Sequence, residues 1–477
     1  MEDTKQKVFS NLIWRFAERI GAQLVGFIVS IVLARILSPS DYGTIALVTV
    51  FTTILQVFVD SGLGNALIQK KDADNVDYST VFYTNIVFCI IIYLIVFFCA
   101  PLIAKFYNDE QLIAITRVLG ITILISGVKN VQQAYVSRKL IFKKFFFATL
   151  AGTIGAGILG IILAKNGYGV WALVVQQLFN LTVDTIILWI TVKWRPQKVF
   201  SFKRLKELFT YGWKLLVSAI LDTTYNNVRQ LLIGKLYSSS DLAFYNKGKQ
   251  LPELVVNNIN TSIDSVLLPT MSKEQEHKEK VKAMTRRAIK TSVFIMSPLM
   301  MGLAFTSNNV IKILLTDKWL PTLPYLCIFC ITFMFYPIHT ANLNAIKAMG
   351  RSDLFLKLEI IKKIMGIILL LITMNISVIA MAVSLLISGL ISQIINSWPN
   401  KKLLNYSYFD QLKDIITNIL LAVFMGICVY FINFLQLSTI ITLLIQIIFG
   451  AIIYIAGAKI IKIDSFEYII DILKNKK

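Results

Sequence analysis

Four long runs without a charged residue constrain what this chain can fold into. They cover Ile86–Ala104, Phe145–Ala164, Ile364–Asn400 and Ile415–Ala458. A membrane-spanning helix needs about 20 mainly apolar residues, so each shorter run is long enough for one helix and each longer run for two. Soluble domains are about 45–50% apolar, whereas this chain of 477 residues is 56% hydrophobic and only 16% charged. The sequence therefore predicts an all-α integral membrane protein.

Hydrophobic segments between polar breaks predict about 14 transmembrane helices. Their approximate ranges are 11–36, 43–66, 79–104, 113–136, 145–165, 169–192, 208–235, 242–270, 288–307, 322–346, 354–374, 376–398, 413–433 and 438–460. After the last of them, Ile463, Phe466, Ile469, Ile470 and Leu473 recur at helical spacing among charged residues. That pattern predicts a short amphipathic helix lying at the membrane interface.

The basic residues orient these helices. The net charge of +21 alone also fits a nucleic-acid-binding protein, but the hydropathy argues against that class, and we expect no nucleic-acid partner. With a cytoplasmic N-terminus, 32 Lys and Arg residues fall in cytoplasmic segments and six in outer segments. This asymmetry follows the positive-inside rule. It predicts an even number of helices with both termini in the cytoplasm.

An internal repeat indicates how the helices are grouped. The segment Leu33–Asp41 recurs 200 residues later as Ile233–Asp241, and in each case the segment ends one predicted helix and precedes another. Two parallel copies of six helices are related by a pseudo-two-fold axis along the membrane normal. We predict four regions: an N-terminal lobe at 1–195, a basic cytoplasmic linker at 196–207, a C-terminal lobe at 208–400, and two further helices with the interfacial helix at 401–477.

Several predicted helices carry a polar stripe on one face. Segment 208–235 places Lys214, Ser218, Asp222, Tyr225 and Arg229 on one face, and segment 242–270 does the same with Asn246, Gln250, Glu253, Asn257, Asn260 and Asp264. Shorter clusters occur at Arg15–Arg19, Thr49–Asp60 and Thr122–Gln133. Charged groups at bilayer depth cost about 2.5–3.5 kcal/mol each, so they normally face a cavity or a partner. We predict a shared water-filled cavity; the alternative is that these groups pair only to hold the bundle together.

Cations outnumber carboxylates in this predicted cavity. The cations are Arg15, Arg19, Lys129, Lys214, Arg229, Lys247 and Lys249, and the carboxylates are Glu18, Asp60, Asp222, Glu253 and Asp264. A cationic field between low-dielectric walls suits an anionic cargo, and guanidinium groups suit phosphate in particular. The carboxylates either carry coupling protons or neutralise neighbouring cations.

Four motif-like patterns lack the context that their chemistry requires. Gly155-x-Gly157-x-x-Gly160 matches a dinucleotide-binding fingerprint but lies in an apolar span, where small residues let helices approach closely. Cys327 and Cys330 form a lone CxxC, and His277 and His339 have no companion at metal-ligand spacing. Asp72-Ala-Asp74 is predicted to be a solvated loop. We therefore expect no cofactor, metal or catalytic site, and no enzyme.

Several segments resemble one family of membrane transporters. They are Leu33–Gly43, Asp60–Asp72, Phe244-Tyr-Asn246, Leu268-Pro-Thr270, and Ser307-Asn-Asn followed by Asp317-Lys-Trp319. The sequence resembles the bacterial polysaccharide flippases, which are the O-antigen, colanic-acid and teichuronic-acid exporters of the multidrug/oligosaccharidyl-lipid/polysaccharide superfamily. The resemblance covers most of the first twelve predicted helices.

This resemblance implies a function. It implies two six-helix lobes around a cationic cavity, in a bacterial cytoplasmic membrane. It also implies that undecaprenyl-diphosphate-linked oligosaccharide moves from the cytoplasmic to the outer leaflet by alternating access, with a polysaccharide polymerase and glycosyltransferases as partners. A cation-coupled multidrug exporter of the same superfamily is the alternative, although the excess of Lys and Arg argues against it. A membrane-embedded polymerase or acyltransferase is disfavoured because no catalytic arrangement is present in the sequence.

Overall fold

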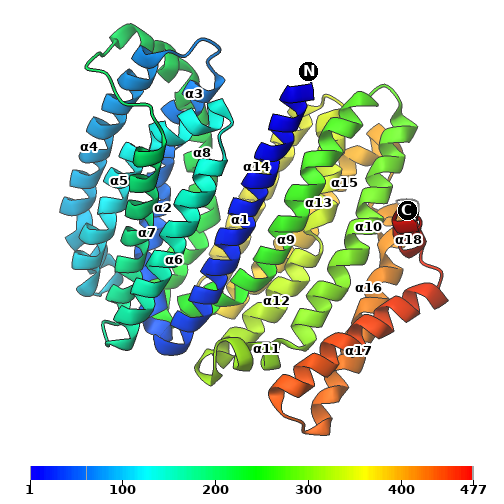
Figure 1. Cartoon of the computed structure of the whole chain (residues 1–477). Coiled ribbons are helices and arrows are strands. Elements are labelled where there is room, and N and C mark those ends of the chain that lie inside the picture. The colour runs from blue at the N-terminus through cyan, green and yellow to red at the C-terminus, as the bar shows by residue number, and fades with distance from the viewer. Residues whose placement is uncertain (1, 61, 475–477) are drawn as a thin grey trace. The chain divides into compact units, whose positions relative to one another are not determined.

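The computed structural model describes residues 2–60 and 62–474, and every regular element there is a helix (Figure 1). The side chains of residues 2–13, Arg15, Phe16, Tyr211, Ile472 and Leu473 lie outside the described set. The chain packs as two compact units, Met1–Ala243 and Phe244–Lys477. The boundary between them falls in the first turns of one helix, α9 (Ser239–Lys273).

Unit 1 contains eight helices within its described residues, besides the start of α9. They are α1 (Glu2–Ile36), α2 (Pro39–Asp60), α3 (Leu63–Gln69), α4 (Asn75–Tyr107), α5 (Gln111–Lys139), α6 (Lys143–Lys165), α7 (Val170–Thr191) and α8 (Phe202–Leu236). Helix α6 packs against both α1 and α7, while α8 packs against α2, α3 and α4. By packing, α8 therefore belongs with the helices that precede it. The symmetric lobes predicted on either side of 196–207 stay a prediction.

Unit 2 contains the rest of α9 and the remaining helices. These are α10 (Lys278–Phe305), α11 (Ser307–Leu314), η1 (Asp317–Thr322), α12 (Leu323–Met334), α13 (Tyr336–Ala348), α14 (Ser352–Thr373), α15 (Val378–Leu404), α16 (Tyr408–Phe431), η2 (Ile432–Leu435), α17 (Thr439–Ile460) and α18 (Asp464–Lys474). Helix α10 packs on α12, α13 and α16, and α16 in turn packs on α17.

Eleven helices among the described residues are long and apolar enough to cross a membrane. This confirms the all-α membrane class, but it does not confirm the count of 14. Each of the three other predicted spans coincides with a helix, namely α8, α9 and α14. The polar residues of α8 and α9 lower their mean hydropathy, whereas α14 is apolar but carries the charged residues Lys357, Glu359, Lys362 and Lys363.

Two predicted continuous helices are interrupted. The segment predicted at 43–66 stops at Asp60 and resumes as α3 at Leu63. Gly62 between them is non-helical, with φ −95° and ψ −92°. The segment predicted at 322–346 divides between α12 and α13, and Pro337 lies at the start of α13. Proline has no N–H to continue the hydrogen-bond ladder, so the helix restarts there.

The repeated segment forms the same turn in both copies. Ser38 Oγ accepts from the Asp41 N–H at 3.2 Å, and the Asp41 carboxylate accepts from the Ser38 N–H at 2.9 Å. The equivalent bonds between Ser238 and Asp241 are 3.1 and 3.2 Å long. Each is a reciprocal capping box that satisfies N–H groups at a helix start. The sequence repeat is therefore confirmed as a structural repeat at this turn.

The two capped turns also touch each other. A Cβ placed on Gly43, in α2, would lie 1.8 Å from the backbone oxygen of Ser239, at the start of α9. A Cβ on Gly234, in α8, would lie 2.0 Å from Leu47 Cδ2 in α2. The position of Gly43 therefore requires glycine because the backbones approach closely, whereas a side chain at Gly234 would displace the Leu47 side chain.

The glycines of α6 also serve close packing. A Cβ on Gly157 would lie 2.4 Å from Val29 of α1, and one on Gly160 would lie 3.2 Å from Gln176 of α7. The reading of this motif as helix packing is therefore confirmed.

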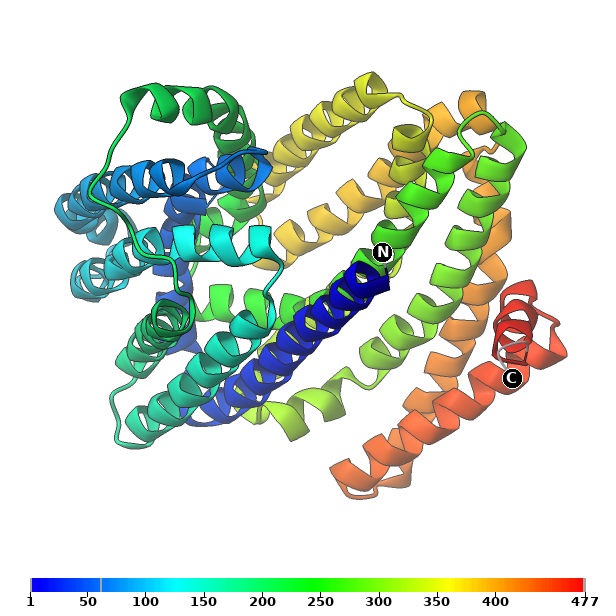
Figure 2. The same ribbon diagram turned by 45° about the horizontal axis from the view of Figure 1, so that its top comes forward.

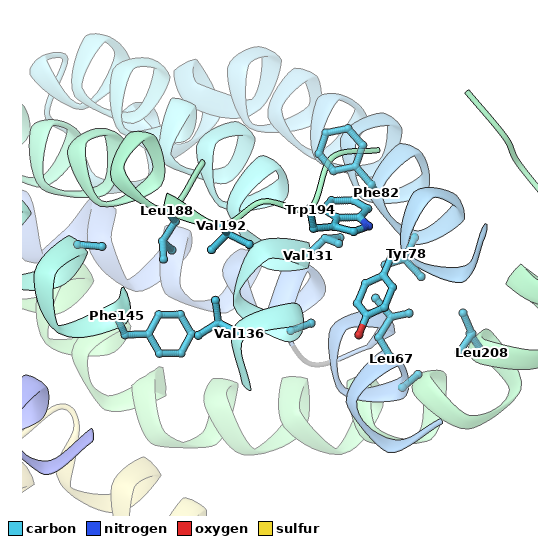
Figure 3. Packing of buried hydrophobic residues seen from close by; sticks show 14 residues of the cluster. Leu67, Tyr78, Phe82, Val131, Val136, Phe145, Leu188, Val192, Trp194 and Leu208 are labelled. Atoms are coloured by element: carbon cyan, nitrogen blue, oxygen red, sulfur yellow. The ribbon is translucent and has the colours of Figure 1, made fainter. Parts of the chain in front are cut away.

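The segment after α7 is held against the start of α4 by side chains. Gln197 N–H donates to Ser79 Oγ at 2.9 Å, and Ser201 N–H donates to Thr80 Oγ1 at 3.1 Å. Beneath this segment lies a cluster of buried apolar residues that includes Trp194, Tyr78 and Phe82 (Figure 3). The predicted basic linker is therefore packed onto unit 1 along its first part.

Ion pairs extend this attachment. Arg204, in α8, lies 2.5 Å from an Asp74 carboxylate oxygen and 3.2 Å from the fully buried Asp77, which also binds Lys70 at 2.8 Å. Asp74 caps α4 by accepting from the backbone N–H groups of Val76 and Asp77. The hydrogen bond from Arg204 lowers the pKa of Asp74 to about 2. Asp72 and Asp74 are exposed in the loop before α4, as predicted, and Asp74 also caps that helix and pairs with Arg204.

The C-terminal helix α18 forms as predicted and lies against α10 (Figure 2). The Phe466 and Phe294 rings are 6.3 Å apart, and the Arg287 guanidinium lies 4.6 Å from the Tyr468 ring. Lys290 binds Asp464, whose pKa is lowered by that contact. The apolar face of α18 therefore packs partly on protein; its location at the membrane interface stays a prediction, and the side chain of Leu473 lies outside the described residues.

Candidate functional site: polar stripes within the two units

Helix α8 carries the charged stripe predicted for it. Lys214, Ser218 and Asp222 are exposed, whereas Arg229 is only 8% exposed. Asp222 accepts a hydrogen bond from Asn226 Nδ2 at 3.2 Å. Charged groups accessible on a helix of this kind need water around them, since lipid does not solvate them. The exposure of this stripe fits a wet surface on unit 1.

Asp60 at the end of α2 joins a network of amide side chains. Gln56 Nε2 donates to one carboxylate oxygen at 3.2 Å, and Asn130 Nδ2 donates to the other at 3.4 Å. Asn130 Oδ1 accepts in turn from Asn85 Nδ2 at 3.2 Å. This network ties together α2, α4 and α5. Asp60 itself is exposed, so it faces water while being held by the network.

Lys129 in α5 is paired with a carboxylate that the sequence analysis did not single out. Its Nζ lies 2.5 Å from Asp184 Oδ2 in α7, and the two side chains are 12% and 11% exposed. The signal was present in the sequence, because Asp184 is the one charged residue of the predicted span 169–192. The positive charge of Lys129 is therefore compensated within unit 1.

The stripe on α1 is only partly described. Glu18 accepts a hydrogen bond from Thr149 of α6 at 3.4 Å, and Arg19 is exposed. The side chain of Arg15, predicted to bind cargo, lies outside the described residues. No ion pair within the described part of the chain involves Arg19 or Lys214.

Helix α9 carries the corresponding stripe in unit 2. Lys249 and Glu253 form an ion pair at 3.3 Å, which neutralises both charges. Lys247 is 8% exposed, donates to Gln250 Oε1 at 3.2 Å and lies 6.0 Å from the ring of Trp319. Asp264, farther along α9, is exposed.

Trp319 also connects two of the segments used for the family resemblance. It is fully buried, and its ring lies 6.0 Å from that of Phe244 in an edge-to-face arrangement. The Phe244-Tyr-Asn246 and Asp317-Lys-Trp319 segments thus pack on each other within unit 2. The aromatic members of these segments therefore serve packing.

A second amide network in unit 2 was also missed. Asn342 exchanges two hydrogen bonds with Gln411, at 2.8 and 3.0 Å, and accepts a third from Asn400 at 2.7 Å. All three residues are buried. Their side chains are uncharged and formed no stripe in the sequence. This network joins α13, α15 and α16 and is structural.

Four of the predicted cations fall into two groups, while Arg229 and Lys247 are buried. Lys129 and Lys249 are neutralised by carboxylates, whereas Arg19 and Lys214 are exposed and lack a carboxylate partner among the described residues. The structure does not place the stripes of unit 1 and unit 2 relative to one another. The prediction of one shared cavity therefore stays a prediction.

The fold is similar to that of a known flippase. It aligns with lipid II flippase MurJ, in an inward closed conformation, at a TM-score of 0.76 and 16% sequence identity, covering 95% of this chain and 99% of that chain. Together with the candidate membrane spans among the described residues, this fold defines the class as an all-helical, multi-pass membrane protein.

The particular family follows from the sequence comparison. Residues 32–324 match the family described as polysaccharide biosynthesis protein, and the chain belongs to that family. It is 24% identical over 357 residues to the teichuronic acid biosynthesis protein TuaB of Bacillus subtilis, covering 74% of each chain. It is also 21% identical over 414 residues to the lipopolysaccharide biosynthesis protein WzxC of Escherichia coli, covering 86% of this chain and 82% of that one. The resemblance noted in the sequence is confirmed.

Proposed function

We propose that the protein is a flippase for undecaprenyl-diphosphate-linked oligosaccharide. It moves these repeat units from the cytoplasmic to the outer leaflet by alternating access, for the synthesis of a cell-surface polysaccharide. The observation that carries the proposal is the family match over residues 32–324. The relatives named for teichuronic acid and lipopolysaccharide biosynthesis support a glycan cargo, and the flippase fold supports lipid-linked transport.

The cations have different roles depending on whether a carboxylate is paired with them. Arg19 and Lys214 are exposed on unit 1 and lack a carboxylate partner among the described residues, so their charge is available to a diphosphate. Guanidinium donates in a planar fork that matches phosphate, and ammonium acts as a point charge. Lys129 and Lys249 are held by Asp184 and Glu253. We therefore assign neither lysine to the cargo: the Lys129 pair joins α5 to α7, and the Lys249 pair compensates charge within α9.

Asp60 and Asp222 are exposed carboxylates of the polar stripes of unit 1. Asp60 sits in an amide network, and Asp222 is held by Asn226. A carboxylate in a hydrated stripe repels a diphosphate, which favours release once the cargo has crossed. Whether one of them carries a coupling proton is tested by exchanging it for its amide and measuring export at different pH values.

We place the protein in the bacterial cytoplasmic membrane with both termini in the cytoplasm. The positive-inside asymmetry of the sequence supports this orientation. A polysaccharide polymerase and glycosyltransferases are the expected partners, because a flipped repeat unit needs enzymes that make it and enzymes that join it.

A deletion strain tests the proposal. Lipid-linked repeat units should accumulate on the cytoplasmic leaflet and become accessible outside only when the gene is restored. Complementation with Arg19→Gln or Lys214→Gln should lower export severalfold at unchanged protein level. Lys401→Gln, which removes an exposed charge outside the stripes, is the matched control and should restore export fully. Normal outer display in the deletion strain, with no second flippase present, would contradict the proposal.

A further inference from the structure

Unit 1 contains a cavity of about 710 Å³ that the proposed transport site does not use. Its lining comes from α2–α3, α4 and α8, with Phe58, Leu63, Phe88, Phe209 and Trp213 among its apolar members. The volume falls in the range of about 300–1,000 Å³ that is typical of ligand sites. Every lining residue belongs to unit 1, so the cavity is independent of the placement of unit 2.

The cavity has one charged end. Lys203 and Lys206, in the first turns of α8, line it, and both are exposed. Of the nearby acidic groups, Asp74 and Asp77 bind Arg204, while the exposed Glu207 lies 3.9 Å from Lys70. No ion pair in the described part of the chain neutralises Lys203 or Lys206. The mouth of an apolar cavity is therefore positively charged.

The part of the cavity beyond its two lysines matches one leaflet of a bilayer in length. Lys206 and Leu216 both line it, and they are ten residues apart on one helix. At 1.5 Å per residue this is about 15 Å, which is half of the roughly 30 Å hydrocarbon core. The charged end lies where the basic segment 193–206 begins α8. By the charge asymmetry of the sequence, that end faces the cytoplasm.

We propose that this cavity binds an anionic phospholipid of the cytoplasmic leaflet. Its phosphate headgroup pairs with Lys203 and Lys206, and an acyl chain occupies the cavity between α4 and α8. Basic residues beside a membrane attract anionic lipid headgroups, and the apolar wall holds the chain by excluding water. The lipid is a resident ligand, distinct from the transported cargo.

The position of the cavity suggests what the lipid does. Gly212 and Gly62 line it at the point where α8 touches the break between α2 and α3; a Cβ on Gly212 would lie 2.9 Å from the Gly62 oxygen. A bound chain fills the space beside this contact and stabilises α8 against α4. Bound lipid therefore raises the stability of unit 1.

Native mass spectrometry of the purified full-length protein tests the proposal. The probes are phosphatidylglycerol, phosphatidylcholine and undecaprenyl phosphate, each titrated separately. We expect phosphatidylglycerol to bind best. The double variant Lys203→Gln/Lys206→Gln should lower the affinity for phosphatidylglycerol about 30-fold, because each of the two lysines contributes a similar part of the binding free energy. The control Lys401→Gln/Lys402→Gln removes the same charge from another exposed segment and should bind as the parent does.

A second variant tests the apolar part. Leu216→Trp fills the deep end of the cavity without touching the lysines, and it should also weaken phosphatidylglycerol binding while the protein stays monodisperse. The proposal is overturned if both variants bind phosphatidylglycerol like the parent, if phosphatidylcholine binds equally well, or if undecaprenyl phosphate binds more tightly than phosphatidylglycerol. The last result would assign the cavity to the cargo lipid and leave the proposed transport function intact.

Discussion

Removal of Lys129 should destabilise the protein strongly. The Lys129 Nζ lies 2.5 Å from Asp184 Oδ2, and both side chains are almost fully buried. The second oxygen, Asp184 Oδ1, is buried without a hydrogen-bond partner in the described structure. Lys129→Met therefore leaves a buried carboxylate with no compensation, which typically costs about 3–5 kcal/mol in the free energy of unfolding.

The pair replacement separates the cost of an orphaned charge from the value of the pair. Lys129→Met/Asp184→Leu removes both charges and leaves apolar side chains of similar size. Because replacing a buried ion pair by apolar residues is often neutral or stabilising, the double variant should recover most of the stability lost in Lys129→Met. Its export activity should recover as well, since we assign Lys129 a structural role.

Equilibrium unfolding in detergent micelles measures the stabilities, and complementation of a deletion strain measures export. The matched control is Lys280→Met, which breaks an ion pair with Glu274 of 3.0 Å whose side chains are 57% and 31% exposed. Exposed pairs contribute about 0–1 kcal/mol. The reasoning fails if Lys129→Met costs no more than Lys280→Met. If the double variant is stable but does not export, Lys129 contributes to the cargo site instead.

Three further predictions concern packing, capping and pH. Gly43→Ala should cost at least about 1–3 kcal/mol by overpacking, because its Cβ would lie 1.8 Å from the Ser239 oxygen; Gly26→Ala, with nothing within 4 Å, is the control and should be tolerated in thermal unfolding. Ser238→Ala removes the cap of α9 and should lower the free energy of unfolding by about 1 kcal/mol in the same assay. An unchanged stability would show that the capping box does not stabilise the helix. Asp74 has a pKa lowered to about 2 by Arg204, so its contribution to stability is present above the ordinary carboxyl pKa of about 4 and is lost as the pH falls toward 2. Asp74→Asn keeps a capping side chain but should abolish this part of the acid dependence of the melting temperature; an unchanged pH profile would refute the assignment.

The helices were predictable because their signal is local. The backbone N–H and C=O groups of each charge-free run must form hydrogen bonds within that run, and an α-helix achieves this in lipid. The capped turns at Ser38 and Ser238 were equally readable, because a cap involves residues three apart. Where a local exception occurred, as at Pro337, the residue itself marks the restart of the helix.

The attachment of the linker was not predictable. Composition marked 196–207 as a basic linker, but Gln197 and Ser201 bind Ser79 and Thr80 more than 100 positions earlier. Hydroxyl side chains of this kind are ordinary in any helix, so the sequence carries no signal of such a contact. The apolar cavity beside α8 was hidden for the same reason.

The sequence by itself determined the membrane class, the helical segments, the repeated turn and the family. These properties depend on hydropathy, on short-range capping and on recurring residue patterns within a segment. Only the tertiary structure decided which charges are compensated. Lys129 and Lys214 look alike in the sequence, yet Lys129 meets Asp184 from another helix, whereas Lys214 is exposed. The physical reason is that an ion pair needs two groups within about 4 Å, and helix packing rather than sequence distance sets that separation.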